Sequence, residues 1–482
     1  MSVAIPALPL IDSLIPAAEA DIHRVFELQR DTALRLRSSS VDERLAKLQR
    51  LRAAVMAHRV AIIEAGAKDF RRPAIEVEFT ELMPVIMEIS HTSNHLRKWL
   101  KPRRVPFTSM SLGTSSWLRY EPRGRCLIIA PWNYPVNLLL GPLVAALACG
   151  NTAMLKTSEM APHFSAVLCK IVRETFAEDE VAIFEGDASV ATTLLSLPFD
   201  HMFFTGSPAV GKVVMAAAAK HLASVTLELG GKSPTIIDET ADLDLAVRAI
   251  IWAKVINNGQ TCIAPDHLYV QATVQDRVIE LFKTHLRRLY GEGAAARQSG
   301  LTRMINQRHT ARVAALIEDA RQRGANIVHG GTVDVPDHFV EPTLLTDVPR
   351  EARIMNEEIF GPVLPIVPYG QLDEVVRSIN DAPKPLAMYI WSRDERAAKT
   401  LLEQTSAGGT CINHVALHVM QLNLPFGGVN NSGIGSYHGE WGIRAFSHER
   451  AVLKTRVFLA RMFFPPYSPL MRRIVDFILR HG

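Results

Sequence analysis

Cysteine is scarce in this chain of 482 residues, which contains five: Cys126, Cys149, Cys169, Cys262 and Cys411. Their odd number and wide spacing argue against a disulfide framework and favour reduced thiols in a cytoplasmic setting. No metal site is expected. The first fifteen residues also lack the basic start and small-residue cleavage pattern of a secretory signal, so they resemble a mature N-terminus.

An excess of charge of one sign is absent as well. The net charge is +4, and no dense basic run interleaved with aromatic residues appears before the C-terminus, so a nucleic-acid partner is not indicated. Charged residues make up 21% and hydrophobic residues 48%, as in ordinary globular proteins. The length exceeds one domain of roughly 100 to 200 residues, so two or three modules are expected.

The C-terminal residues 456–482 form a basic tail without an apolar run of the roughly 20 residues needed to cross a bilayer. Helical spacing predicts an apolar face of Leu470, Met471, Ile474, Val475 and Ile478 opposite a charged face of Arg472, Arg473, Asp476 and Arg480. Such a helix either lies on a membrane surface or packs on the protein body or a partner subunit. Both interpretations stay open, and with them a cytoplasmic or a membrane-peripheral location.

The order of the predicted elements favours an α/β fold. A helical segment from Asp21 to Lys101 comes first, and a Ser/Thr-rich stretch at 106–121 is expected to form a protruding β-hairpin. Strands and helices then alternate, with a second unit starting near Gly230. The predicted strands lie at 126–131, 152–156, 201–206, 233–238 and 267–272, and the predicted helices at 163–176, 207–220 and 243–254.

A candidate nucleophile closes a turn in the second unit. Residues 257–262 read NNGQTC, which places Cys262 at the end of a turn built from Asn and Gly. The thiolate is the reactive form of cysteine, and backbone N–H groups at a loop end stabilise it. The competing interpretation is a small buried hydrophobic residue, which is the more common role of a lone cysteine.

Two polar residues follow predicted strands, at the edge where open α/β sheets bind ligands. Asn133 in PWNYP is either an amide donor or a turn residue between two prolines. Glu228 in LELGGKSP is either a general base or the ribose-binding acid of a dinucleotide fold, about 20 residues beyond the turn from Gly206 to Gly211. Spacing alone does not choose, since GSPAVG lacks the full G-x-G-x-x-G pattern.

In combination, the motifs resemble the aldehyde dehydrogenase superfamily over nearly the whole chain. The family's order and rough spacing are matched by PWNYP at 131, KTSE at 156, FTGS at 204, LELGGKSP at 227, NNGQTCIAPD at 257, EEIFGPVLP at 357 and PFGGVNNSGIG at 425. Three details are similar to the class 3 branch of fatty, aromatic and coniferyl aldehyde dehydrogenases: Ala264-Pro265-Asp266, KPLAMY at 384–389 and GSYHG at 435–439.

The resemblance implies a mechanism. Cys262 attacks the aldehyde carbon, and the Asn133 amide and the Cys262 backbone N–H hold the oxyanion of the thiohemiacetal. Hydride transfer to the nicotinamide leaves a thioester, and Glu228 activates the water that releases the acid. The implied substrate is an apolar aldehyde, either medium- to long-chain aliphatic or aromatic and phenylpropanoid.

The resemblance also implies a cofactor site. Lys156 and Glu159 correspond to contacts with the adenosine ribose, and Glu358 and Phe360 to contacts with the nicotinamide and its ribose. Gly206 and Ser207 approach the pyrophosphate, and Trp132 and Gly211 complete the implied cofactor-binding set. Glu159 repels a 2′-phosphate, which favours NAD, but Lys156 offsets this repulsion, so NADP use stays open.

The implied architecture is a Rossmann-type NAD(P)-binding domain (1–105 and 122–229), a catalytic domain (230–410) and a bridging element (106–121 and 411–455). Class 3 relatives are dimers, so a homodimer is expected. The tail, with Phe458, Phe463, Phe464 and Tyr467, is a hypothetical cap for the substrate funnel. Two other functions remain: a CoA-acylating aldehyde dehydrogenase, and a non-catalytic structural protein on the same scaffold.

Overall fold

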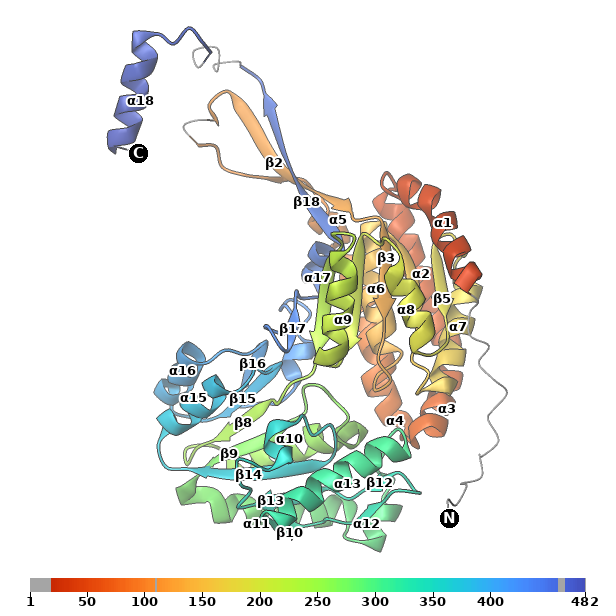
Figure 1. The fold of residues 1–482 in the computed structure, drawn as a ribbon, viewed down its shortest axis with the longest axis vertical. Coiled ribbons are helices and arrows are strands. Elements are labelled where there is room, and N and C mark those ends of the chain that lie inside the picture. The colour runs from red at the N-terminus through yellow and green to blue at the C-terminus, as the bar shows by residue number, and fades with distance from the viewer. Residues whose placement is uncertain (1–18, 109–110, 458–463, 482) are drawn as a thin grey trace.

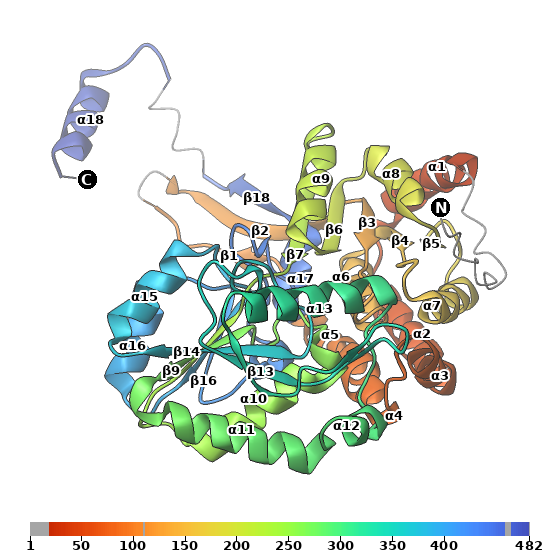
Figure 2. The same cartoon turned by 60° about the horizontal axis from the view of Figure 1, so that its bottom comes forward.

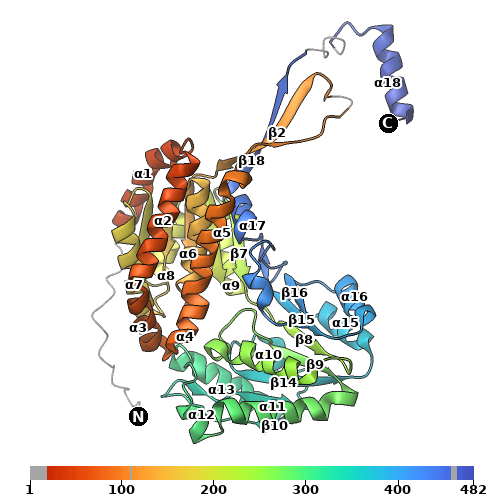
Figure 3. The same cartoon turned by 180° about the vertical axis from the view of Figure 1, so that it is seen from behind.

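The described residues form two large sheets, a projecting three-stranded ribbon and a small two-stranded sheet (Figure 1). The computed structural model describes residues 19–108, 111–457 and 464–481. Helices α8 and α9 lie on one face of the upper sheet in Figure 1, and α2, α5 and α6 cover the opposite face, which is in front in Figure 3. The predicted α/β fold is confirmed.

Helices precede the first sheet, as predicted for the N-terminal segment. They are α1 Glu19–Leu36, α2 Val41–Ala57, α3 Arg59–Phe70, α4 Ala74–Val77, the π-helix η1 Glu78–Leu82 and α5 Met83–Trp99. Helix α2 shows why the segment folds this way: Ser40 caps it by accepting a hydrogen bond from the backbone N–H of Glu43, and Leu48, Leu51 and Val55 are fully buried on one face.

The first sheet has the strand order β17-β7-β6-β3-β4-β5 and is parallel except for β17. Its strands are β3 Arg125–Ile129, β4 Thr152–Lys156, β5 Val181–Phe184, β6 His201–Gly206, β7 Ser224–Leu229 and β17 Gly433–Ile434. The helices around it are α6 Asn137–Cys149, α7 Pro162–Thr175, α8 Ala188–Ser196 and α9 Pro208–Ala219. Because the strands are parallel, their carboxyl ends share one edge, where the chain leaves β7 for the second sheet.

The second sheet, in the foreground of Figure 2, has the order β10-β13-β14-β9-β8-β15-β16, with only β10 antiparallel to its neighbour. Its strands are β8 Pro234–Ile237, β9 His267–Gln271, β10 Asn326–His329, β13 Thr343–Thr346, β14 Val363–Tyr369, β15 Ala387–Trp391 and β16 Gly409–Ile412. The longer helices are α10 Leu243–Val255, α11 Gln275–Tyr290, α13 Gln307–Gln322, α15 Leu372–Asp381 and α16 Glu395–Gln404.

Short elements complete the fold. They are η3 Ile256–Gly259, η4 Ala272–Val274, α12 Ala294–Gln298, β11 Val333–Asp334, β12 Phe339–Val340, α14 Arg353–Asn356, η5 Leu417–Met420 and α17 Gly439–Ala445. Among them, η3 contains the NNG part of the cysteine turn and η5 contributes to the wall of the cavity described below.

The ribbon consists of β1 Arg103–Arg104, β2 Thr114–Pro122 and β18 Ser447–Thr455, all antiparallel. The segment expected to be a self-contained hairpin supplies one long strand, β2, whose partner along its whole length is β18. The short β1 pairs with only two residues of β2 and leads into Pro106, which lacks a backbone donor for a longer ladder. The ribbon is therefore built from two segments far apart in the sequence.

Helix α18, Pro469–His481, lies beyond the tip of the ribbon and apart from both sheets (Figures 1 and 3). Of the predicted apolar face, Met471 is buried, whereas Leu470, Val475 and Ile478 are exposed. The aromatic Phe458 and Phe463 fall outside the described residues. No helix in the described part of the chain is long and apolar enough to cross a membrane.

Candidate active site

The cysteine turn adopts a conformation that few sequences tolerate. Asn257, Asn258 and Gly259 have consecutive positive φ values of 49°, 51° and 75°. Asparagine accepts the left-handed region better than most residues, and a Cβ on Gly259 would lie 2.3 Å from the carbonyl oxygen of Gly361. Cys262 follows this turn and is partly exposed, while the other four cysteines are buried.

The surroundings of Cys262 oppose its ionisation in the absence of ligands. Burial, together with the nearby carboxylates of Glu358 and Glu228, raises the pKa of the Cys262 thiol to about 12. The backbone N–H groups of Cys262 and Ile263 act in the opposite sense by pointing at the sulfur. The sulfur therefore lies between two carboxylates and two backbone donors.

Asn133 reaches the cysteine turn directly. It lies beyond the end of β3, is 3% exposed, and its Nδ2 donates a hydrogen bond of 3.0 Å to the carbonyl oxygen of Gln260, two residues before Cys262. The next residue, Tyr134, shares a hydrogen bond of 2.5 Å with the hydroxyl of Thr261. The structure thus brings together two segments that sequence analysis singled out separately.

Glu228 lies near the end of β7, buried, with no hydrogen-bond partner for either carboxylate oxygen. Burial raises its pKa well above the ordinary range for glutamate. A carboxyl group kept unpaired near a cysteine is unusual in a core, because buried polar groups normally have partners. This arrangement suits a proton acceptor better than a structural residue.

Glu358 occupies a position that requires glycine opposite it. Its Oε2 lies 2.1 Å from where a Cβ of Gly230 would be, and the backbone N–H of Gly231 donates to its carboxylate. Its Oε1 is buried without a partner, and burial raises its pKa to about 7. The LELGG and EEIFGP motifs therefore meet beside the cysteine.

Asp266, from the APD sequence after the cysteine, links three motifs. One carboxylate oxygen lies 2.5 Å from Lys232 Nζ, and the other accepts the backbone N–H of Ile359 at 3.0 Å. Lys232 also donates to the carbonyl oxygens of Ile354 and Glu357. Asp266 and Lys232 thereby fix the backbone around Glu358.

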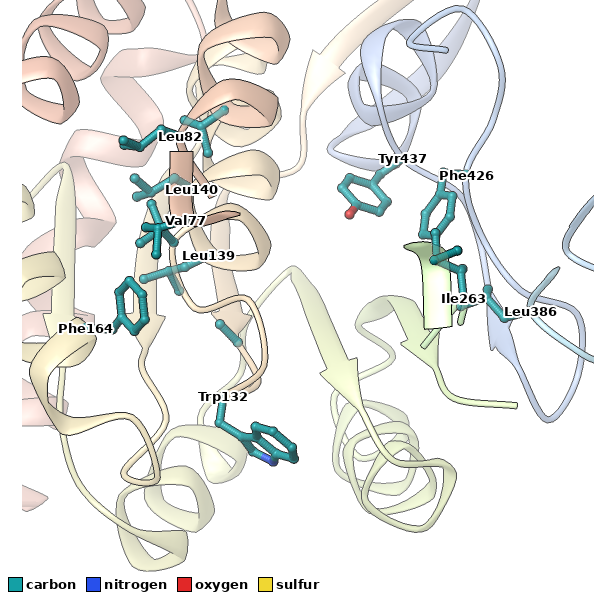
Figure 4. Packing of buried hydrophobic residues seen from close by; sticks show 14 of the residues in the cluster. Val77, Leu82, Trp132, Leu139, Leu140, Phe164, Ile263, Leu386, Phe426 and Tyr437 are labelled. Atoms are coloured by element: carbon teal, nitrogen blue, oxygen red, sulfur yellow. The ribbon is translucent and has the colours of Figure 1, made fainter. Parts of the chain in front are cut away.

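Two aromatic side chains, Trp132 and Phe360, bring the PWNYP and EEIFGP motifs into contact. Trp132, whose indole is labelled in Figure 4, is buried and meets the Phe360 ring edge-on at 5.4 Å. Phe360 has a positive φ of 47°, a strained value that is often kept for function. In the first sheet, Lys156 at the end of β4 donates a hydrogen bond of 2.9 Å to Glu159.

The turn between β6 and α9 is built for close approach. Gly206 ends β6, and a Cβ there would collide with the ring of Phe204. Ser207 caps α9 by accepting from the backbone N–H of Val210, and Gly211 packs against Leu229 so tightly that a Cβ would lie 2.6 Å away. The N-terminus of α9 is therefore available to an anionic group. Together with the unpaired Oε1 of Glu358 and the Trp132–Phe360 pair, these residues fit a dinucleotide.

A funnel leads from the surface to Cys262. Its walls come from the π-helix and α5, the start of α6, α10 with the cysteine turn, and the segment from η5 to His438. The lining residues are mostly apolar: Phe79, Pro84, Met87, Tyr134, Leu138, Trp252, Ile256, Ile263, Ala416, Leu417, Val419, Met420, Leu422, Phe426 and Tyr437. Figure 4 shows Tyr437, Phe426 and Ile263 close together on one side. The funnel suits an apolar ligand.

Sequence reasoning missed residues that lie behind the site. Arg72 and Glu81 form a buried ion pair next to Asn133 and carry no motif. His309 packs on Trp132 at 4.9 Å, and neither ring nitrogen has a hydrogen-bond partner. Tyr437 belongs to the GSYHG motif, which indicates the family branch, and it lines the funnel together with Cys262. Among these missed residues, only Tyr437 lies in a motif from which a role at the site could have been predicted.

Comparison with known proteins agrees with this geometry. Residues 10–452 match the Aldehyde dehydrogenase family. A Bacillus subtilis (strain 168) protein that carries a provisional aldehyde dehydrogenase name, AldX, is 47% identical over 433 residues, covering 90% of this chain and 97% of the relative. The "Aldehyde dehydrogenase, dimeric NADP-preferring" of Mus musculus is 39% identical, covering 90% and 94%. A solved structure, "Substrate bound state of Staphylococcus Aureus AldH", superposes with a TM-score of 0.90 at 37% identity, covering 95% and 99%.

The fold and these matches define an NAD(P)-dependent oxidoreductase that acts on aldehydes. The chain belongs to the aldehyde dehydrogenase family and has its fold. Relatives that include a family 3 member place it in the class 3 branch, as the APD, KPLAMY and GSYHG segments predicted.

Proposed function

We propose that the protein oxidises apolar aldehydes to carboxylic acids through a thioester on Cys262. The observation that carries this proposal is the funnel, which is apolar along its length and ends at a partly exposed cysteine flanked by Glu228. A bound nicotinamide supplies the hydride acceptor. The test is steady-state NADH formation with hexanal, dodecanal, hexadecanal, benzaldehyde and coniferyl aldehyde, each assayed with NAD and with NADP.

In this mechanism the side chains divide the work. The Cys262 thiol loses its proton to solvent, its sulfur adds to the aldehyde carbon, and the oxyanion receives hydrogen bonds from Asn133 Nδ2 and the Cys262 backbone N–H. After hydride departs, the carbon is held as a thioester. Glu228 takes a proton from water, the hydroxide adds to the thioester carbonyl, and the C–S bond breaks to release the acid and the thiolate. Glu228 serves as the base and not as a ribose ligand, because its unpaired oxygens lie near the sulfur.

Glu228 also separates hydrolysis from the CoA-acylating alternative. Transfer of the acyl group to a thiol needs no water-activating base. Burying the Glu228 carboxyl group without a partner costs folding free energy, and a role as base accounts for its presence. A non-catalytic structural role is disfavoured for the same reason, since a scaffold protein has no use for an unpaired acid beside a partly exposed thiol. Acid formation without added CoA supports hydrolysis.

Substrate preference follows from the funnel walls. Each buried CH₂ contributes about 0.8 kcal/mol, so kcat/KM is expected to rise by up to about fourfold per carbon from short to medium chains.

Met87→Glu on α5 places a charge in the wall and is expected to raise KM for dodecanal at least about tenfold. The matched control is Met56→Glu, an exposed methionine outside the funnel. Equal KM values for the two variants contradict the proposed binding path.

We infer that NAD is preferred, with NADP accepted. The Glu159 carboxylate would face a 2′-phosphate with a like charge, while its partner Lys156 compensates in part. Glu159→Gln is expected to raise kcat/KM for NADP relative to NAD about tenfold. The control is Glu174→Gln, which changes an exposed glutamate in helix α7. An unchanged ratio in Glu159→Gln removes Glu159 from the ribose site.

The ribbon supports a homodimer as the working assembly. The outer edge of β18 lacks a strand partner within the described chain, and a paired edge is the usual way to protect such a strand.

The role of the C-terminal tail is a separate proposal. Helix α18 lies away from this chain's own funnel, so a cap would act only on a second copy. Its exposed apolar residues and Arg472, Arg473 and Arg480 also fit peripheral contact with a membrane.

A further inference from the structure

A buried arginine lies directly behind the proposed oxyanion site. Arg72 follows α3 and is 1% exposed. Its Nη2 donates to the carbonyl oxygen of Asn133 at 2.8 Å and to Oδ1 of Asn257 at 2.6 Å, and its Nη1 donates to Glu81 at 2.9 Å. One guanidinium thus joins the PWNYP segment, the cysteine turn and the π-helix.

Glu81 holds the same segment from the other side. Its second oxygen, Oε2, accepts the backbone N–H groups of Val136 and Asn137, each at 3.0 Å. These two residues lie at the start of α6, three and four positions after Asn133. Arg72 and Glu81 therefore fix the backbone from the carbonyl group of the proposed amide donor to the start of α6.

The amide of Asn133 is left with one hydrogen to use. An Asn side chain has two N–H donors, and Asn133 directs one of them to the carbonyl oxygen of Gln260. Asn257 Nδ2 bridges the same two residues, since it donates to the backbone carbonyl oxygens of Asn133 at 2.9 Å and of Gln260 at 3.1 Å. In the proposed mechanism the second Asn133 hydrogen binds the substrate oxygen, and this network holds the residue that carries it.

Stability does not explain why such a network is kept. Both side chains of the Arg72–Glu81 pair are 0% exposed, and burial raises the pKa of Glu81 even with Arg72 beside it. Removing two charges from water costs about as much as their attraction returns, so a buried ion pair is weak evidence for stabilisation. Fixed geometry is the benefit that remains, and an oxyanion site requires it.

We propose that Arg72, oriented by Glu81, is a positioning residue that sets the Asn133 amide relative to the Cys262 sulfur. The inference rests on the proposed function, in which Asn133 binds the oxyanion. Lysine carries the same charge, but a single ammonium does not reproduce the planar fork that contacts Asn133, Asn257 and Glu81 together.

Arg72→Lys is expected to lower kcat about 100-fold, because misplacement of a catalytic group by about 1 Å costs that much. KM for aldehyde and Kd for NAD are expected to change less than about threefold. The matched control is Arg44→Lys, a second buried arginine whose contacts are Ser39 and the carbonyl oxygen of Ala148. This control is expected to lose comparable thermal stability and to keep kcat, per folded molecule, within about twofold of wild type.

A double-mutant cycle separates positioning from a general structural effect. Asn133→Ala alone is expected to lower kcat about 100- to 1000-fold, and adding Arg72→Lys to it is expected to cost less than about threefold more. Additive losses overturn the proposal, as does a kcat for Arg72→Lys equal to that of Arg44→Lys. If Arg72→Lys does not fold, Glu81→Gln, which keeps an acceptor oxygen, enters the same cycle with an expected loss of about tenfold.

The cycle also distinguishes the two levels of inference. If Asn133→Ala keeps full kcat, the oxyanion assignment is wrong and the positioning role is overturned with it. If Asn133→Ala lowers kcat but Arg72→Lys and Glu81→Gln do not, only the positioning role is overturned.

Discussion

Cys262→Ala is expected to abolish aldehyde oxidation, with kcat falling at least about 10⁴-fold, the scale on which loss of a covalent nucleophile falls in other enzymes. The substitution removes the sulfur that carries the acyl group but leaves the cofactor cleft intact. The Kd for NAD, measured by the quenching of tryptophan fluorescence, is therefore expected to remain within about twofold of the wild-type value.

Cys411→Ala is the matched control for this experiment. Cys411 is buried outside the funnel lining and lies 3.2 Å from His418 Nδ1, so it is a second cysteine with a polar partner. Activity within about fivefold of wild type is expected. Residual turnover of Cys262→Ala above about 1% of wild type would assign the nucleophile to another group.

Glu228→Gln is expected to block the second half of the reaction while sparing the first. Acylation needs no base at this position, so a burst of about one NADH per active site is expected, followed by a steady state slower by about 10²- to 10⁴-fold. Rapid mixing with acid quenching then traps the thioester, which mass spectrometry detects on Cys262. A normal steady state after the burst contradicts the assignment of Glu228 as base.

The same variant has a pH-dependent effect on stability. The pKa of Glu228 is higher in the folded protein than in the unfolded chain. The stability that the protonated Glu228 contributes to the wild type is therefore lost as pH rises above the unfolded pKa and through the folded pKa. Glutamine does not titrate. Glu228→Gln is therefore expected to unfold at a higher temperature than wild type at pH 8 and at nearly the same temperature at pH 4. An opposite trend means that Glu228 is paired in solution.

Two of the proposed catalytic residues were predictable because they lie at strand ends. Asn133 follows β3, Glu228 lies near the end of β7, and parallel strands bring their carboxyl ends to one edge. Cys262 was recognised from a turn sequence whose Asn and Gly residues adopt the left-handed backbone that they tolerate. In these cases a local pattern carried the information, and the family resemblance chose between the alternatives that the residues left open.

The supporting network was not predictable, because its partners are distant in the sequence. Arg72 lies 61 positions from Asn133 and 185 from Asn257, and its own surroundings read as ordinary amphipathic helix. The ribbon illustrates the same limit, since the true partner of β2 lies more than 300 residues away. The funnel wall likewise combines four separate segments. Tertiary packing alone creates these arrangements.

The π-helix Glu78–Leu82 limits how this enzyme can diversify. Two of its residues, Phe79 and Thr80, line the funnel, and the next, Glu81, holds Arg72. A single insertion or deletion here would rotate the following residues by about 100° and turn Glu81 away from its partner. New substrate ranges should therefore arise on the wall around η5, whose described residues make no hydrogen bond to Arg72 or Glu81.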